Sequence, residues 1–324
     1  MYQFCTLFDS NFLTRGLAMY ESLRENCDSF HLYIFAFDDL CRDILKELSL
    51  ENTTVISLKE FETHDLLAIK PTRSRAEYCW TCTPSTIRYS IDRFKLDHCT
   101  YLDADLYFWG SPNLLLDELG DNSILITEHN YTPKYDQSNK SGKYCVQFMT
   151  FRNDERGNKA LNWWCEACNE WCYDRFEDGK FGDQKYLDDW VERFEGVHVL
   201  RHPGGGVAPW NVQQYDIIEE SRGIVFRSKL SGEIFPLVFY HFHPVRFYTN
   251  GLIDLGGYPI SKNAKKFLYK PYVEHLEDIA RRLPTTNKSV LSHGTRGLKW
   301  TNLWNWLRHL KHMCIGTVLK KESL

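Results

Sequence analysis

Residues 99–108 read CTYLDADLYF and place two carboxylates, Asp103 and Asp105, directly after a hydrophobic, strand-like run. The apolar residues on both sides disfavour a solvent-facing charge cluster, because a buried carboxylate is costly unless a metal ion or another partner balances it. Paired carboxylates at a strand end present hard oxygen ligands, which suit Mg²⁺ or Mn²⁺ bridging the phosphates of a nucleotide. A functional metal site is therefore the favoured interpretation, and a purely structural pair of acids is the alternative.

The composition is that of an ordinary soluble globular protein. Of 324 residues, 43% are hydrophobic and 25% are charged, and the formal net charge is −4, so nothing in the overall charge points to nucleic acid. The eleven cysteines are odd in number and irregularly spaced. Residues 1–8 look like a strand rather than a secretion signal, and no run of about 18 apolar residues interrupts the sequence. We therefore expect a cytoplasmic protein with reduced thiols.

The first half alternates strand-like and helix-like segments, which predicts an α/β fold with a mainly parallel sheet and helices on both faces. Ligands of such sheets bind beyond the carboxyl ends of the strands. Phe8 and Asp9 end the first predicted strand and the acid pair ends the fourth, so both are expected at one crevice. The predicted strands cover 2–8, 31–37, 54–58 and 99–103, and the predicted helices cover 13–25, 40–49, 59–68 and 83–94.

The second half is more mixed, and no linker or repeat divides it. Cys165, Cys168 and Cys172 fall on one face of a predicted Trp-rich helix, where packing is favoured over a zinc or iron–sulfur site because buried cysteines behave as small hydrophobic residues. We expect one α/β domain over 1–250 and a C-terminal helical extension over 251–324. The predicted elements are strands at 123–128, 144–151, 197–200 and 237–242, a helix at 154–173, a short helix from 183, and a loop at 202–211 that closes over a ligand or lies at the surface.

Two later motifs add polar groups at predicted element ends. Segment 239–246, FYHFHPVR, ends a strand with His241, His243 and Arg246. Either histidine is a candidate third metal ligand and Arg246 a candidate for gripping a diphosphate, against the alternative of a structural strand-end histidine. Asp183 and Gln184 follow a turn glycine at a predicted helix start, where they suit the hydroxyls of a sugar, although a helix N-cap is a frequent role for aspartate.

With these motifs in this order, residues 2–247 resemble glycosyltransferases of the GT-A type, most closely the bacterial family 8-like sugar-nucleotide transferases. The resemblance lies in segments 8–12 (FDSNF), 101–105 (YLDAD), 182–184 (GDQ) and 241–242 (HF). It implies a GT-A fold and a role for each matching residue. The implied nucleotide contacts are Leu7, Phe8, Asp9, Asn11, Phe12, Asp103, Ala104 and Arg246; the implied metal ligands are Asp103, Asp105, His241 and His243; and the implied catalytic residues at the donor sugar are Asp183 and Gln184.

The resemblance also implies a reaction. It is the Mn²⁺- or Mg²⁺-dependent transfer of a sugar from a nucleotide-sugar donor, a UDP-sugar by resemblance, to a glycan or lipid-linked acceptor, with the anomeric configuration retained. Such acceptors belong to cell-surface polysaccharide or lipopolysaccharide synthesis. An inverting transferase with Asp183 as the base and a non-catalytic sugar-nucleotide-binding protein are the alternatives.

Three positions depart from the family pattern. Pro244 stands where the family has a glycine after the late histidine, with Arg246 in the place of a lysine. Cys145-Val146-Gln147 replaces an Asn-x-Gly segment that lines the sugar site in relatives, so the donor sugar stays open. The family also has an arginine near the start of the helix that precedes the acid motif, and Arg88 lies later than that position.

Residues 298–319 follow helical spacing with an apolar, Trp-containing face and a basic flank that includes Lys311. Such a helix is typical of binding to an anionic membrane surface, which would hold the protein at the inner face of the cytoplasmic membrane. The alternative is an amphipathic helix docked on the domain or on another subunit.

Overall fold

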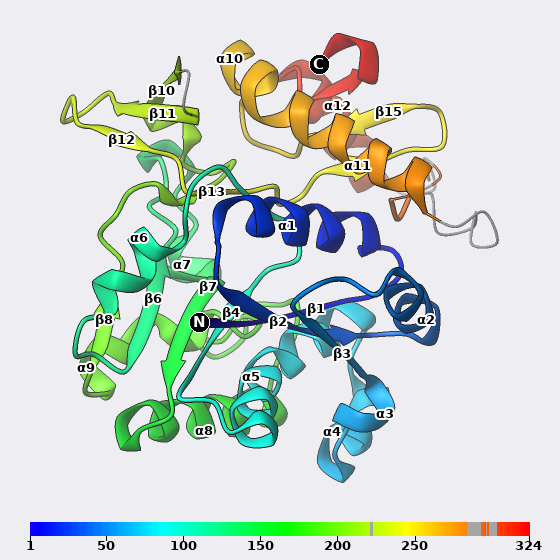
Figure 1. Cartoon of the computed structure of the whole chain (residues 1–324). Helices are drawn as coiled ribbons and strands as arrows, with labels where there is room; N and C mark the ends of the chain where they lie inside the picture. Colours follow the sequence, from blue (N-terminus) through cyan, green and yellow to red (C-terminus); the bar gives the residue numbers. More distant parts are fainter. Residues whose placement is uncertain (221–222, 284–292, 296, 298–302) are drawn as a thin grey trace.

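The central element of the structure is a mixed sheet of seven strands in the order β3-β2-β1-β4-β7-β6-β8 (Figure 1). The computed structural model describes residues 1–220, 223–283, 293–295, 297 and 303–324. Strands β3, β2, β1 and β4 run parallel, whereas β7 is antiparallel to both β4 and β6. The mainly parallel α/β sheet predicted from the sequence is therefore confirmed. Its strands are β1 (Tyr2–Phe8), β2 (Phe30–Ala36), β3 (Thr53–Ser57), β4 (His98–Leu102), β6 (Ile124–Glu128), β7 (Tyr144–Arg152) and β8 (Val197–Val199).

Helices cover both faces of this sheet because its buried strands alternate their side chains between two cores. In β1, Phe4 and Phe8 face the core shared with α1 (Leu13–Asn26) and α2 (Asp39–Leu48), and Cys5 and Leu7 face the core shared with α5 (Arg75–Phe94) and α8 (Glu155–Glu170). In Figure 1, α1 lies above the sheet and α5 and α8 lie below it. The sheet is thus buried on both sides, and its strand ends are left for binding.

Two predicted helix boundaries were wrong. The helix α5 begins at Arg75 rather than at residue 83, since Ser74 and Glu77 form a reciprocal capping box, and Pro84 lies inside the helix instead of at its start. The helix predicted over 59–68 is two short helices, α3 (Leu58–Phe61) and α4 (His64–Ile69), because the side chain of Thr63 accepts the Leu66 N–H and begins a new helix there.

A second, three-stranded sheet stands at the carboxyl edge of the first. It consists of β5 (Leu106–Phe108), β13 (Phe239–His241) and β9 (Gly205–Val207), so the segment predicted as a loop over 202–211 contains a strand. An antiparallel ribbon of β10 (Tyr215–Glu220), β11 (Gly223–Ser228) and β12 (Ile234–Pro236) projects beside it. The short helices α6 (Asn113–Leu116), α7 (Ser138–Ser141) and α9 (Trp190–Arg193) lie in the connections that lead into β6, β7 and β8 of the main sheet.

The C-terminal segment lies over α1 (Figure 1). Leu268, Tyr272 and Leu276 are fully buried in the same hydrophobic core as α1. Besides α10 (Lys262–Ala264), α11 (Lys270–Arg282) and α12 (Leu303–Cys314), the segment contains a sheet of β14 (Arg246–Phe247), β15 (Leu252–Asp254) and β16 (Val318–Lys320). Strand β14 precedes residue 250 and pairs with β15, which follows it, so this sheet spans the predicted domain boundary. The division into a catalytic domain and a C-terminal extension stays a prediction.

The amphipathic helix expected over 298–319 corresponds in part to α12, and residues 298–302 lie outside the described residues. The last turn of α12 is docked on the sheet, because the His312 imidazole is 2.9 Å from a carboxylate oxygen of Asp254 and both side chains are buried. Within the described residues, no helix is long and apolar enough to cross a membrane.

An ion cluster between α1 and α11 predicts a pH-dependent contribution to stability. His275 Nε2 lies 2.8 Å and Arg282 Nη2 2.9 Å from Glu21 Oε2. Although burial alone would raise it, these hydrogen bonds lower the pKa of Glu21 to about 2. We expect Glu21→Gln to reduce the free energy of unfolding on the order of 2 kcal/mol at pH 7. Because the folded-state pKa is depressed, this contribution is complete above about pH 4.5 and is lost as the pH falls toward 2.

Denaturant unfolding of wild type and variant at pH 7, 5 and 3.5 measures this difference. Glu25→Gln is the matched control, because Glu25 lies one turn further along α1 and is exposed. A Glu21→Gln penalty that is as large at pH 3.5 as at pH 7 would contradict the assignment.

Candidate functional site

The acid motif forms the turn between β4 and β5. The backbone N–H of Asp103 donates to the carbonyl of Gln147 in β7 over 3.0 Å, and the N–H of Leu106 returns to the Asp103 carbonyl over 3.2 Å. The Tyr101 hydroxyl donates to Asp103 Oδ1 over 3.1 Å. The hydrophobic strand thus ends by directing both carboxylates out of the carboxyl edge of the main sheet.

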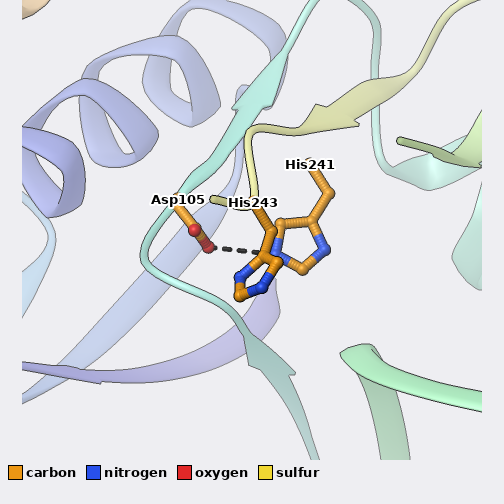
Figure 2. A group of neighbouring side chains, drawn as sticks. All are labelled: Asp105, His241 and His243. Carbon is orange, nitrogen blue, oxygen red and sulfur yellow. Dashed lines mark ion pairs between the residues drawn. The ribbon is translucent and has the colours of Figure 1, made fainter. Parts of the chain in front are cut away.

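The late histidines meet this turn because β13 pairs antiparallel with β5, placing His241 opposite Leu106. His241 Nε2 lies 3.1 Å from Asp105 Oδ1 and 3.6 Å from Asp103 Oδ2. Asp105, His241 and His243 each offer a ligand atom, and these atoms lie within 4.8 Å of one another. Figure 2 shows the Asp105 carboxylate on the turn before β5 and the two imidazoles, from the end of β13 and just beyond it, lying together. Three of the four predicted ligands therefore converge, and Asp103 lies beside them through its contact with His241.

The charges of this cluster do not balance. Burial alone would raise the pKa of Asp105, but the adjacent His241 holds it below its usual range. Burial and the neighbouring Asp105 charge raise the pKa of Asp103. The two carboxylates thus share the charge of one imidazolium, which gives up its Nε2 proton when a cation binds there. Carboxylate oxygens with imidazole nitrogens fit Mn²⁺ or Mg²⁺, whose charge would supply what the cluster lacks.

Asp183 lies near the cluster, whereas the side chain of Gln184 turns to the backbone. Asp183 is 6% exposed, and burial together with the Asp103 charge raises the pKa of its carboxyl to about 7. The Trp164 indole N–H donates to the Asp183 carbonyl over 2.9 Å, which fixes the backbone there. Gln184 Nε2 donates to the carbonyl of Ser141 over 2.8 Å, so its amide holds a loop in this structure.

The residues at the end of β1 that are predicted to hold the nucleotide differ in their exposure. The side chains of Leu7 and Phe8 are buried in the core and their backbone is paired with β2, whereas Asn11 and Phe12 are exposed. Asp9 Oδ1 accepts the backbone N–H groups of Asn11 and Phe12 over 2.8 and 3.1 Å. Asp9 therefore shapes the loop that presents the two exposed side chains.

An arginine at the start of α5 was missed by the sequence analysis. Arg75 Nε lies 2.5 Å from Asp9 Oδ2, and its Nη2 lies 2.7 Å from Asp38 Oδ2. Arg88 instead pairs with Asp92 on the same helix. Arg75 lies near the start of the helix, where the family pattern has an arginine. The Ser-x-x-Glu sequence at residues 74–77 is typical of a helix N-terminus and was the signal that could have predicted this position.

Two further arginines join the site to the C-terminal segment. Arg246 Nη1 lies 3.7 Å from Asp254 Oδ2, which ties this predicted diphosphate ligand to β15. Arg15, also missed from the sequence, is 5% exposed and donates to the carbonyls of Val245 and His293 over 3.0 and 2.9 Å. Its charge contributes to the low pKa of Asp105, after the effect of the histidines.

The chain has sequence relatives over most of its length. No protein-family model matches the chain. Two proteins of Bacillus subtilis strain 168, the uncharacterized proteins YfnD and YfnF, are 29% and 28% identical to it over 282 and 291 residues. These alignments cover 85% and 87% of this chain and 89% and 94% of the relatives.

Solved structures of the galactosyltransferase LgtC are similar in three dimensions. LgtC in complex with donor and acceptor sugar analogs aligns with a TM-score of 0.54 at 14% identity, over 89% of this chain and 99% of LgtC. An active-site mutant of LgtC aligns with a TM-score of 0.51 at 12% identity over the same shares. The predicted architecture is confirmed: the chain has the GT-A fold of these glycosyltransferases.

Proposed function

We propose that this protein is a metal-dependent glycosyltransferase that moves a sugar from a nucleotide-diphosphate sugar, a UDP-sugar, to a glycan or lipid-linked sugar. The observation that carries the proposal is the convergence of Asp103, Asp105, His241 and His243 at the carboxyl edge of a GT-A sheet. Ligand sites of such sheets lie at that edge, and the donor set matches the cations that accompany nucleotide diphosphates.

The residues that converge at this edge have distinct roles in the proposed reaction. Asp105, His241 and His243, with Asp103, would hold Mn²⁺ or Mg²⁺, whose charge stabilises the departing diphosphate. The exposed Asn11 and Phe12 lie where the nucleoside would bind, beside the Asp9–Arg75 pair. The Asp183 carboxylate would accept hydrogen bonds from the hydroxyls of the donor sugar and so orient its anomeric carbon.

The stereochemical outcome that we propose is retention, on the strength of the family resemblance. The inverting alternative gains support from Asp183, because a carboxyl whose pKa is about 7 is poised to act as a general base. Proton NMR of the anomeric linkage in the product, compared with the α-linked donor, distinguishes the two. A β-linked product would overturn retention and would favour Asp183 as the acceptor base.

The function itself is tested by a screen of sugar nucleotides by thermal shift with Mn²⁺, followed by an assay for free nucleoside diphosphate. A bound donor adds RT ln(1 + [L]/Kd) to the free energy of unfolding, which is about 2.7 kcal/mol at a donor concentration of 100 times Kd. The melting temperature rises as a result. We expect one UDP-sugar to stabilise the protein in the presence of Mn²⁺ and to be turned over slowly without acceptor. Binding without turnover under any acceptor condition would favour a non-catalytic sugar-nucleotide-binding protein.

A membrane-linked acceptor predicts that the C-terminal segment binds anionic lipid. Lys311 on α12 and Lys320 on β16 are both exposed. We expect Lys311→Glu with Lys320→Glu to reduce co-sedimentation with phosphatidylglycerol vesicles, since each basic residue near an anionic surface contributes about 1 kcal/mol. Neutral phosphatidylcholine vesicles are the control. Equal sedimentation of wild type and double variant would indicate that the helix only docks on the domain.

A further inference from the structure

The histidine of the acid cluster is held by a buried side chain from the main sheet. His241 Nδ1 lies 2.8 Å from Gln147 Oε1. Gln147 lies in β7 and is 0% exposed, and its backbone carbonyl is the acceptor for the N–H of Asp103. One residue therefore contacts both halves of the cluster, the acid turn through its backbone and the histidine through its side chain.

The direction of the hydrogen bond between Gln147 and His241 follows from the other contact of the Gln147 amide, which is with Thr127. The hydroxyl of Thr127 in β6 donates to the Cys145 carbonyl over 3.0 Å, which uses its one proton. Gln147 Nε2 lies 3.4 Å from that hydroxyl oxygen, so the amide nitrogen must be the donor there. The amide oxygen of Gln147 then faces His241 and can only accept. Nδ1 of His241 consequently carries a proton and donates it.

This orientation selects which nitrogen of His241 is available. With Nδ1 engaged by Gln147, the imidazole presents Nε2 to Asp105 and Asp103, at 3.1 and 3.6 Å. Metal-binding histidines generally donate their other ring N–H to an oxygen, which sets both the tautomer and the angle of the ring. Because Thr127 is 1% exposed and Gln147 is fully buried, water does not compete for these bonds.

We propose that Thr127 and Gln147 are positioning residues that lock His241 in the Nδ1-protonated form, with Nε2 directed to the divalent cation. The proposal rests on the proposed function only for the identity of that site as a metal site. It assigns a purpose to Gln147, at a position where the sequence departs from the Asn-x-Gly segment of related transferases. Gln147 does not touch the cation; it acts through His241.

Mn²⁺ titration of the full-length protein, followed by electron paramagnetic resonance, tests the proposal without any assay of activity. Gln147→Leu removes both polar atoms and is expected to weaken Mn²⁺ binding about 10- to 100-fold, the range seen when partners of metal ligands are removed. Gln147→Glu keeps an oxygen for the Nδ1 proton, so it is expected to bind Mn²⁺ more tightly than Gln147→Leu. Thr127→Val frees the amide to turn over and is expected to fall between the two.

Thr150→Val is the matched control for a lost buried hydroxyl. Thr150 lies in β7 and is 1% exposed, and its hydroxyl bonds to Thr100 over 2.9 Å without contact to His241. This variant is expected to lose stability and to keep the wild-type Mn²⁺ affinity. The ¹⁵N spectrum of the Mg²⁺-loaded wild type is expected to show His241 protonated at Nδ1, a signature that a loss of packing alone would not produce.

The outcomes separate the two proposals. If wild type binds Mn²⁺ and folded Gln147→Leu binds it equally well, the positioning role is wrong while the proposed function stands. A wild-type spectrum in which His241 is protonated at Nε2 would likewise contradict the positioning role and leave the proposed function standing. If wild type binds no Mn²⁺ and loses none of its transfer activity in EDTA, the metal site and the positioning role both fall. If it neither binds Mn²⁺ nor turns over any donor, the proposed function fails with them.

Discussion

Replacing Asp105 with asparagine is expected to lower glycosyl transfer by at least about 1,000-fold, which corresponds to about 4 kcal/mol of transition-state stabilisation. Asp105 is the carboxylate nearest to His241 and one of the three residues whose ligand atoms converge. Asparagine has the same shape, but it removes the negative charge that would hold the cation. The loss should therefore persist at any Mn²⁺ concentration at which the protein stays soluble.

Initial rates of nucleoside diphosphate release against Mn²⁺ concentration measure this effect. Asp121→Asn is the control, because Asp121 is exposed at a turn and its side chain is remote from the cluster in the described structure. Removing the ion from wild type with EDTA should reproduce the loss, and adding Mn²⁺ should restore the rate only in wild type. An Asp105→Asn enzyme that turns over at the wild-type rate would overturn the metal assignment.

Replacing Asp183 with asparagine is expected to reduce transfer by at least about 100-fold while making the protein more stable at alkaline pH. The activity falls because an amide cannot accept from the donor sugar as a carboxylate does. Stability changes because the folded-state pKa of this carboxyl is about 7, above its usual value. Ionisation of Asp183 therefore costs folding free energy, and this cost grows as the pH rises from about 4 through 7.

Thermal melts in EDTA at pH 5, 7 and 8.5 measure the stability part. Asparagine avoids the charge, so the variant should gain on the order of 1 to 3 kcal/mol over wild type at pH 8.5 and about a third of that gain at pH 5. Asp178→Asn is the control, because Asp178 is exposed and adopts a φ of 49°, which asparagine also tolerates. A stability gain that does not change with pH would show that Asp183 ionises as freely as it does in solvent.

The regular elements were predictable because their signals are local. The strand-helix alternation placed β1, α1, β2, α2, β3 and β4 within a residue or two, since periodicity and burial are read directly from neighbouring residues. The errors were also local: Pro84 was placed at a helix start, and the helix cap at Ser74 and Glu77 was overlooked. That one boundary error hid Arg75, which the structure places against Asp9.

We could predict from the sequence the α/β architecture, the acid motif at the end of the fourth strand, and the late histidines as candidate partners for it. These conclusions depend on residue type and on order along the chain. The neighbours of each side chain, in contrast, are known only from the folded structure. Gln147 and His241 are 94 residues apart, and they meet because β7 and β13 flank the same acid turn. Arg246 meets Asp254 across a hairpin rather than standing alone at the cluster. Contacts between distant segments depend on strand order and register, which the packing of the whole core sets and which no local pattern encodes.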